Sequence, residues 1–188
     1  MVQKAGFLKG KNIYLRPLID EDAEGDYHLW FNDEEVCRGN SHHVLPHTKE
    51  KTRNYIRHAR ETTDEFILAI ALNDTGKHIG NIAFQEINPV YRSADLTILI
   101  GDRSVWGKGY GLEAADLLLR HGFFTMNLHR ISCATFDTNT AMKKIALSLG
   151  MKEEGRRVQA AYKDGKYIDV VEFGMLKSDY EQKTKKKP

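Results

Sequence analysis

Residues 106–111, Trp106-Gly107-Lys108-Gly109-Tyr110-Gly111, place three glycines at every second position. An apolar run, residues 96–100, precedes them, and residues 112–121 follow with helical spacing. Strand, glycine-rich turn and helix in this order bring backbone N–H groups together, where a phosphate can bind at the positive end of the helix dipole. A tight turn without a ligand is the alternative, because such a turn alone is weak evidence for a phosphate site.

The size and composition of the chain indicate one globular domain. The chain has 188 residues, of which 41% are hydrophobic and 29% are charged, enough to bury a sizeable core. The net charge is +2, but four of the 28 basic residues stand in the last six positions, so the rest of the chain is nearly neutral. We expect a single domain over residues 1–178, a basic, disordered tail over residues 179–188, and no nucleic-acid partner.

Cysteine and histidine usage favours neither a disulfide scaffold nor a metal site. Cys37 and Cys133 are far apart, which is typical of a reducing compartment. His42, His43 and His47 share no regular spacing with a carboxylate or cysteine, so we expect a surface loop and no metal there. The first ten residues lack a signal-peptide core, and no apolar run is long enough to span a bilayer. A cytoplasmic protein without a membrane partner is therefore expected.

The periodicity of the chain predicts the order β-α-α-β-β-β-α-β-α-β-β. Strands are expected at residues 11–18, 65–72, 78–87, 93–100, 129–136, 151–162 and 167–176, and helices at residues 20–32, 48–61, 110–126 and 139–149. Gly150 should end the last helix in the left-handed conformation. This is a mixed α+β domain on one central, mostly antiparallel sheet of about seven strands and four helices. A Rossmann fold is excluded, because the glycine spacing is GxGxG and the first half is rich in hairpins.

This order, with the glycine turn after the fourth strand, resembles the GNAT superfamily of acyl-CoA-dependent N-acetyltransferases. The resemblance is carried by residues 98–102, 106–114 and 139–151, the last of which ends in Leu149-Gly150-Met151. Residues 164–169 are similar to the RimJ/RimL-type branch, which includes ribosomal-protein, polyamine and nucleotide-sugar acetyltransferases.

The resemblance implies that acetyl-CoA is the co-substrate and that it lies along a strand that splays from its neighbour. The main chain of that strand would pair with the pantetheine arm, the turn amides would hold the pyrophosphate, and Lys108 would add a contact to a CoA phosphate. Asn139 would hydrogen-bond the pantetheine, cap its helix, or do both. The residues expected to bind the cofactor are Ile98, Leu99, Ile100, Trp106, Gly107, Lys108, Gly109, Tyr110, Gly111 and Asn139.

Three positions depart from the pattern of the resembled family. Trp106 stands where an Arg or Gln usually opens the glycine motif, and Met142 stands where many relatives have Ser. Ala146 occupies the position at which relatives often carry a tyrosine that protonates the leaving thiolate. Either the thiolate leaves with a proton from solvent or another donor, or the chain is a catalytically silent acyl-CoA-binding module.

The resemblance implies direct attack of a neutral amine on the thioester, so the amine must first lose a proton. Glu86, on a strand expected to face the cleft, and Asp95, which begins the strand before the glycine turn, are the candidate bases. Each could instead be a surface carboxylate or a partner of Arg92. Tyr162 could donate a proton or line the acceptor pocket, or it could simply pack in the closing hairpin.

The acceptor amine should be selected by the first helices and the loop after them. Trp30, Asn32 and Glu34 could bind it, and an acidic rim of this kind suits a polyamine, although the same residues could be a helix end packed on the sheet. The arginines of residues 53–60 would instead suit an amino-sugar nucleotide. A protein N-terminus as acceptor, and a homodimer, also stay open.

Overall fold

One eight-stranded sheet runs through residues 6–185, the part of the chain described by the computed structural model. Its strand order is β1-β2-β3-β4-β5-β6-β8-β7, and every neighbouring pair is antiparallel except β5 and β6. The mixed α+β fold predicted from the sequence is confirmed. The strands are β1 (Leu8–Lys9), β2 (Ile13–Pro17), β3 (Phe66–Leu72), β4 (His78–Asn88), β5 (Ser93–Ile100), β6 (Arg130–Phe136), β7 (Lys152–Lys163) and β8 (Lys166–Leu176).

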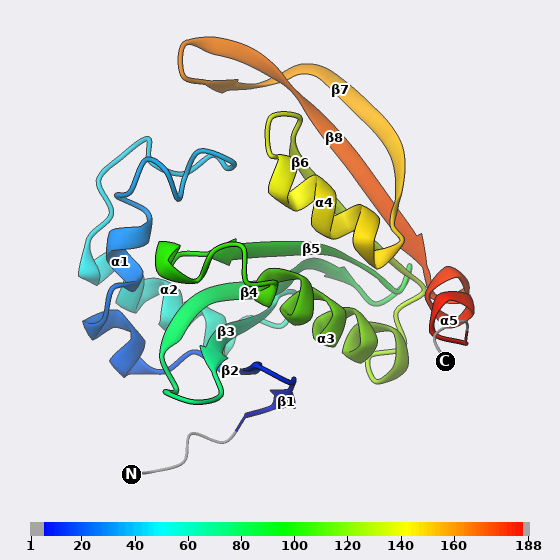
Figure 1. The fold of residues 1–188 in the computed structure, drawn as a ribbon, viewed down its shortest axis with the longest axis horizontal. Coiled ribbons are helices and arrows are strands. Elements are labelled where there is room, and N and C mark those ends of the chain that lie inside the picture. Colours follow the sequence, from blue (N-terminus) through cyan, green and yellow to red (C-terminus); the bar gives the residue numbers. More distant parts are fainter. Residues whose placement is uncertain (1–5, 186–188) are drawn as a thin grey trace.

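Helices cover both faces of the sheet (Figure 1). One face packs against α3 (Tyr110–Phe124) and α4 (Thr140–Leu149), and the other against η1 (Asp20–Glu24), α1 (Tyr27–Trp30) and α2 (Lys49–Glu61). The apolar run of β3 supplies both layers, because successive strand residues point to opposite faces: Leu68 belongs to the α3 core and Ala69 to the α2 core. No helix within residues 6–185 has the length and apolar character needed to cross a membrane.

The pairing between β5 and β6 stops early. Only Ser93, Ala94 and Asp95 of β5 pair with β6, although β5 continues to Ile100 and β6 to Phe136. The two strands therefore diverge, and the backbone edge of β5 beyond Asp95 has no strand partner on the β6 side (Figure 1). This is the splayed pair that the sequence resemblance implied.

Local sequence signals fix most of the helix ends. Thr48 caps α2 by accepting a hydrogen bond from the Lys51 N–H at 3.3 Å. Gly150 ends α4 with a φ of 87°, and its N–H bonds the Ala146 and Leu147 carbonyls, as the left-handed stop requires. These predicted boundaries are confirmed.

Two predictions are wrong, one about the first helix and one about the tail. The helix expected over residues 20–32 is two short helices, η1 and α1, because Gly25 is extended between them. The tail expected to be disordered from residue 179 instead forms a helix, α5 (Lys177–Lys185), while residues 186–188 lie outside the described part. Tyr180 explains the difference: it is buried against Phe123 and bonds Asp116, so this turn of the tail belongs to the core.

Candidate active site

A cleft of about 630 Å³ opens on the α1/α2 face of the sheet and continues into the splay. Residues 96–99 of β5 and 134–136 of β6 line its inner end. Aromatic side chains form the wall at the other end, and they come from α1, α2 and the segment between them: Tyr27, Phe31 and Tyr55. The splayed strands and the first helices, which are far apart in sequence, therefore share one cavity.

The glycine turn at the end of β5 leaves open space around its backbone. Gly107 and Gly109 have φ angles of 76° and 84°, and a Cβ built on either would meet nothing within 4 Å. The first intrahelical bond of α3 runs from the Glu113 N–H to the Gly109 carbonyl, so the N–H groups of the preceding turn have no acceptor within the helix. The Lys108 N–H donates to the Val105 carbonyl at 3.4 Å, whereas the amides at the start of α3 have no intrahelical acceptor, and with the open space beside them they fit a bound diphosphate.

Gly111 has a different role from the other two glycines. It lies inside α3, where an added Cβ would be 3.2 Å from Ile145 and 3.6 Å from Ile98 and Ile100. Its missing side chain lets α3 approach α4 and β5. Its place in the helix interface adds a packing role, while its N–H lies in the first turn of α3 and has no acceptor within the helix.

Trp106 connects the end of β5 to the turn. Its indole Nε1–H donates to the Ile100 carbonyl at 2.9 Å, and the Arg103 guanidinium lies 5.9 Å from its ring. That carbonyl was expected to be open to the pantetheine arm. The tryptophan that stands in place of the usual Arg or Gln therefore stabilises the turn through its hydrogen bond to the end of β5.

Asn139 caps α4 and lines the cleft. Its Oδ1 accepts from the Met142 N–H at 3.0 Å, and its Nδ2 donates to the Gly39 carbonyl at 3.1 Å. The capping role is confirmed, and the second bond ties the loop after α1 to the cofactor side of the cleft. A contact with pantetheine stays a prediction. Met142 also lines the cleft, whereas Ala146 is fully buried in the core.

The residues expected to bind the acceptor, Trp30, Asn32 and Glu34, are not among those that line the cleft. Trp30 is buried and packs on His78. Asn32 exchanges hydrogen bonds with the backbone of His47, at 2.8 Å to its N–H and 2.7 Å to its carbonyl. Glu34 is exposed and is not among the residues that line the cleft. The alternative of a helix end packed on the sheet agrees with Trp30, whereas Asn32 is exposed and holds the loop at His47.

None of the three catalytic candidates is among the residues that line the cleft. Strand alternation turns Asn81, Ala83 and Gln85 of β4 toward it, and Glu86 is exposed at a bulge with a φ of 51°. The expectation that Glu86 faces the cleft is wrong. Tyr162 is 63% exposed and packs edge-on against Tyr167 at 5.1 Å, which agrees with the alternative of a hairpin aromatic.

Asp95 is the candidate base that the structure keeps beside the cleft. It pairs in register with Gln85 and stands two residues before Thr97, and both of these line the cavity. Burial, together with the nearby carboxylates of Glu86 and Glu172, raises the pKa of Asp95 above its ordinary value. A carboxyl group with a raised pKa is a stronger proton acceptor than an exposed one.

The loop that carries His42, His43 and His47 contributes to the cleft, as expected for the loop after the first helix, but a part for the histidines themselves was not predicted. His42 and His47 line the cleft and contact the Phe31 ring at 4.7 and 4.6 Å between ring centroids. The tip of the β7–β8 hairpin reaches the same loop, since the Lys163 ammonium donates to the His42 carbonyl at 3.4 Å. Their irregular spacing in the sequence gave no signal that the loop covers a cavity.

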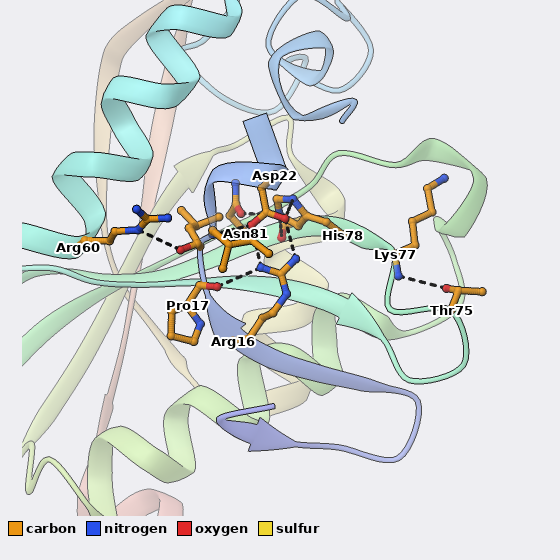
Figure 2. Close-up of polar contacts among 11 residues, drawn as sticks. Arg16, Pro17, Asp22, Arg60, Thr75, Lys77, His78 and Asn81 are labelled. Carbon is orange, nitrogen blue, oxygen red and sulfur yellow. Dashed lines mark hydrogen bonds and ion pairs between the residues drawn. The ribbon is translucent and has the colours of Figure 1, made fainter. Parts of the chain in front are cut away.

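A buried chain of polar side chains, Arg16, Asp22 and His78, leads to Asn81 (Figure 2). Arg16 donates to both carboxylate oxygens of Asp22, at 2.6 and 2.7 Å, and each side chain is 3% exposed. His78 continues from Asp22 to Asn81, which is a cleft residue. Sequence reasoning missed this chain, because its members come from β2, η1 and the start of β4 and carry no recognisable spacing.

The basic side chains on α2 do not reach the cleft. Arg53 pairs with Glu24 at 2.7 Å and Arg60 with Asp20 at 3.0 Å, so these arginines hold η1 against α2. The argument from this cluster for an acidic acceptor therefore fails.

Comparison with known proteins identifies what this site resembles. The family profile described as Acetyltransferase (GNAT) domain matches residues 12–152. The chain is 29% identical over 174 residues to the "Uncharacterized N-acetyltransferase p20" of Bacillus licheniformis, covering 90% of this chain and 96% of that protein. It is 26% identical over 169 residues to the spermidine N(1)-acetyltransferase of Escherichia coli K12, covering 90% and 88% of the two chains.

The fold is also shared with a solved structure. The spermidine N-acetyltransferase of Vibrio cholerae in complex with CoA and spermine superposes with a TM-score of 0.80 at 23% identity, covering 90% of this chain and 98% of that one. The RimJ/RimL-type branch is not distinguished by these relatives and stays a prediction.

Proposed function

The chain belongs to the GNAT acetyltransferase family and uses acetyl-CoA, and on that premise we propose that it acetylates the primary amine of a small molecule bound in the cleft. One observation carries the proposal. The inner end of the cleft is lined by the splayed strands and its outer end by the first helices, so a thioester and an amine can meet in one cavity.

The residues present fit acetyl-CoA. Under this proposal amides of residues 107–111 hold the diphosphate, the Lys108 side chain lies beside it, and the unpaired edge of β5 beyond Asp95 pairs with the amide-rich arm. Bound acetyl-CoA supplies the thioester that the amine attacks. Met142 and Asn139 then form the wall opposite β5.

Asp95 is our candidate for the group that receives the proton of the amine. An alkyl ammonium has a pKa of about 10, so it is charged at neutral pH and has no free lone pair. The apolar, aromatic lining of the cleft favours the uncharged amine. Asp95, whose pKa is raised by burial and by Glu86 and Glu172, can accept the released proton through water.

The leaving thiolate takes its proton from solvent under this proposal. The position where relatives often carry a tyrosine is Ala146, fully buried in the core, and the two tyrosines that line the cleft, Tyr27 and Tyr55, come from α1 and α2. A thiol with a pKa of about 8.5 is a fair leaving group without a dedicated acid. This proposal accounts for activity without a tyrosine on α4.

The test is thiol release from acetyl-CoA in the presence of a panel of primary amines. The panel should contain alkylamines, amino alcohols, polyamines, amino-sugar nucleotides and peptide N-termini. We expect thiol release with small-molecule amines and acetylated product on the amine nitrogen. Tight CoA binding, seen as a rise in melting temperature, with no turnover on any amine would reject catalysis and leave only a binding module.

A further inference from the structure

The proton on His78 can be assigned from its neighbours. Its Nε2 lies 2.9 Å from the Gly80 carbonyl oxygen and 2.9 Å from Asn81 Oδ1. A backbone carbonyl only accepts hydrogen bonds, so Nε2 must carry the hydrogen in this arrangement. His78 is thus a donor toward Asn81.

The ring of His78 is held in place on its other sides. The rings of Tyr27 and Trp30 pack edge-on against it at 5.3 and 4.9 Å, and its Nδ1 lies 3.4 Å from Asp22 Oδ1, a contact that is attractive when Nδ1 also carries a hydrogen. Asp22 in turn is fixed by Arg16 and by the Ile19 N–H at 2.9 Å (Figure 2). A ring clamped in this way keeps its Nε2–H directed at Asn81.

This orientation decides what Asn81 offers to the cleft. Because Oδ1 receives the hydrogen bond from His78, the amide NH₂ faces away from the histidine. Burial raises the pKa of Tyr27 well above its ordinary value and outweighs the neighbouring Asn81 side chain, which acts as a donor and lowers it, so the phenol stays protonated. A protonated phenol carries one hydrogen, which the Tyr27 hydroxyl can donate toward the cleft. Both residues line the cleft, so this end presents hydrogen-bond donors.

Among the described residues, those that line the cleft include no aspartate or glutamate that could accept a hydrogen bond at this end. Gln85 is the residue of β4 that offers an acceptor, because its Nε2 donates to Glu65 at 3.0 Å and leaves Oε1 for the cleft. Gln85 stands four residues from Asn81, about 13 Å along the strand. The two ends of the β4 face thus differ. The end at Gln85 suits an amine N–H, and the end at Asn81 suits an oxygen atom of the ligand.

We propose that the acceptor molecule carries, besides its amine, a hydroxyl or carbonyl oxygen that Asn81 and Tyr27 bind, and that the chain Arg16–Asp22–His78 positions Asn81 for this contact. A second ammonium in its place would bring donors against donors, since an ammonium has no lone pair, and would be buried without a countercharge. Amino alcohols and related oxygen-bearing amines are therefore favoured over polyamines. The inference rests on the proposed transfer of acetyl to an amine in this cleft.

The test uses amines that differ only at the far end: H₂N–(CH₂)n–X, where X is OH, CH₃ or NH₃⁺ and n runs from 2 to 6. For the wild-type enzyme we expect kcat/KM at the best chain length to be about tenfold or more higher for OH than for the other two, because a site built to hydrogen-bond an oxygen rejects analogues that lack it. Equal values for OH and CH₃, or a preference for NH₃⁺, would overturn the inference. If neither this series nor the wider panel of amines gave any thiol release, the proposed function itself would be overturned.

Substitutions at Asn81 and His78 separate positioning from folding. Asn81→Asp replaces the donor by an acceptor and should shift the preference from OH to NH₃⁺, whereas an unchanged preference would overturn the assigned contact. His78→Phe keeps the ring between Tyr27 and Trp30 but frees the Asn81 amide to turn. It should abolish the OH preference while CoA affinity stays the same, and His78→Gln, which retains a donor, should restore the preference. If His78→Phe does not fold, the Asn81→Asp arm decides.

Discussion

The substitution of Gly109 by Asp, compared with Asn, tests the phosphate site by charge alone. Gly109 is the residue before α3, with φ 84° and ψ 2°, and a side chain there would enter open space. Asn and Asp are nearly identical in size and both tolerate the left-handed conformation better than other residues. The backbone strain of about 1 kcal/mol is therefore common to both variants and cancels when they are compared.

The charge effect can be estimated from the position. Two like unit charges about 4 Å apart repel by about 1 kcal/mol in water and about 4 kcal/mol near a protein surface. Gly109→Asp should therefore bind CoA about 5-fold to several hundred-fold more weakly than Gly109→Asn. The gap should narrow in high salt, because screening shortens the range of the repulsion.

The assay is titration of each variant with CoA by calorimetry, at low and at high salt, with melting temperatures to confirm folding. Pantetheine serves as a control ligand, since it lacks the diphosphate and should bind both variants with the same affinity. Equal CoA affinities for Gly109→Asn and Gly109→Asp would refute the placement of the diphosphate at this turn.

Three further predictions concern other residues of the site. Asp22→Asn leaves Arg16 buried without its counter-ion and should cost about 3–5 kcal/mol of unfolding free energy in denaturant titrations at pH 7. Although burial opposes it, the hydrogen bonds from Arg16 keep the pKa of Asp22 below its ordinary value, so this contribution is present above the unfolded pKa and should be lost as pH falls through the folded one. Asn139→Asp keeps the oxygen that caps α4 but loses the donor to the Gly39 carbonyl, so KM for the amine should rise while the melting temperature changes little. An unchanged KM would argue against a role of the Asn139–Gly39 hydrogen bond in holding the loop at the cleft. Asp95→Asn should lower kcat by about 10²- to 10⁴-fold if Asp95 is the base; because burial and its acidic neighbours raise the pKa of Asp95, its ionised form costs stability at pH 7, so the variant should be no less stable, and full activity would exclude this role.

Features set by short stretches of chain could be predicted from the sequence. The glycine turn, the cap at Asn139 and the stop at Gly150 each depend on residues within one or two turns, so their conformations follow from residue type. The splay between β5 and β6 came from family resemblance, because nothing in either strand alone shows where their pairing ends.

Features that depend on pairing between distant segments could not be predicted. Arg16, Asp22 and His78 meet because β2, β3 and β4 pair in a particular register. Glu86 was expected at the cleft, but alternation along β4 gives that place to Gln85, and a shift of one residue moves a side chain to the other face. Burial of Tyr180, which orders the tail, likewise depends on a neighbour, Phe123, far back in the sequence.

The most direct test of the account is mass spectrometry of the product formed from acetyl-CoA and the matched amines of the OH, CH₃ and NH₃⁺ series. The account predicts one acetyl group on the amine nitrogen, formed fastest from the amino alcohol, together with an equal amount of free CoA. Free CoA without acetylated amine, or no product from any amine despite tight CoA binding, would contradict it.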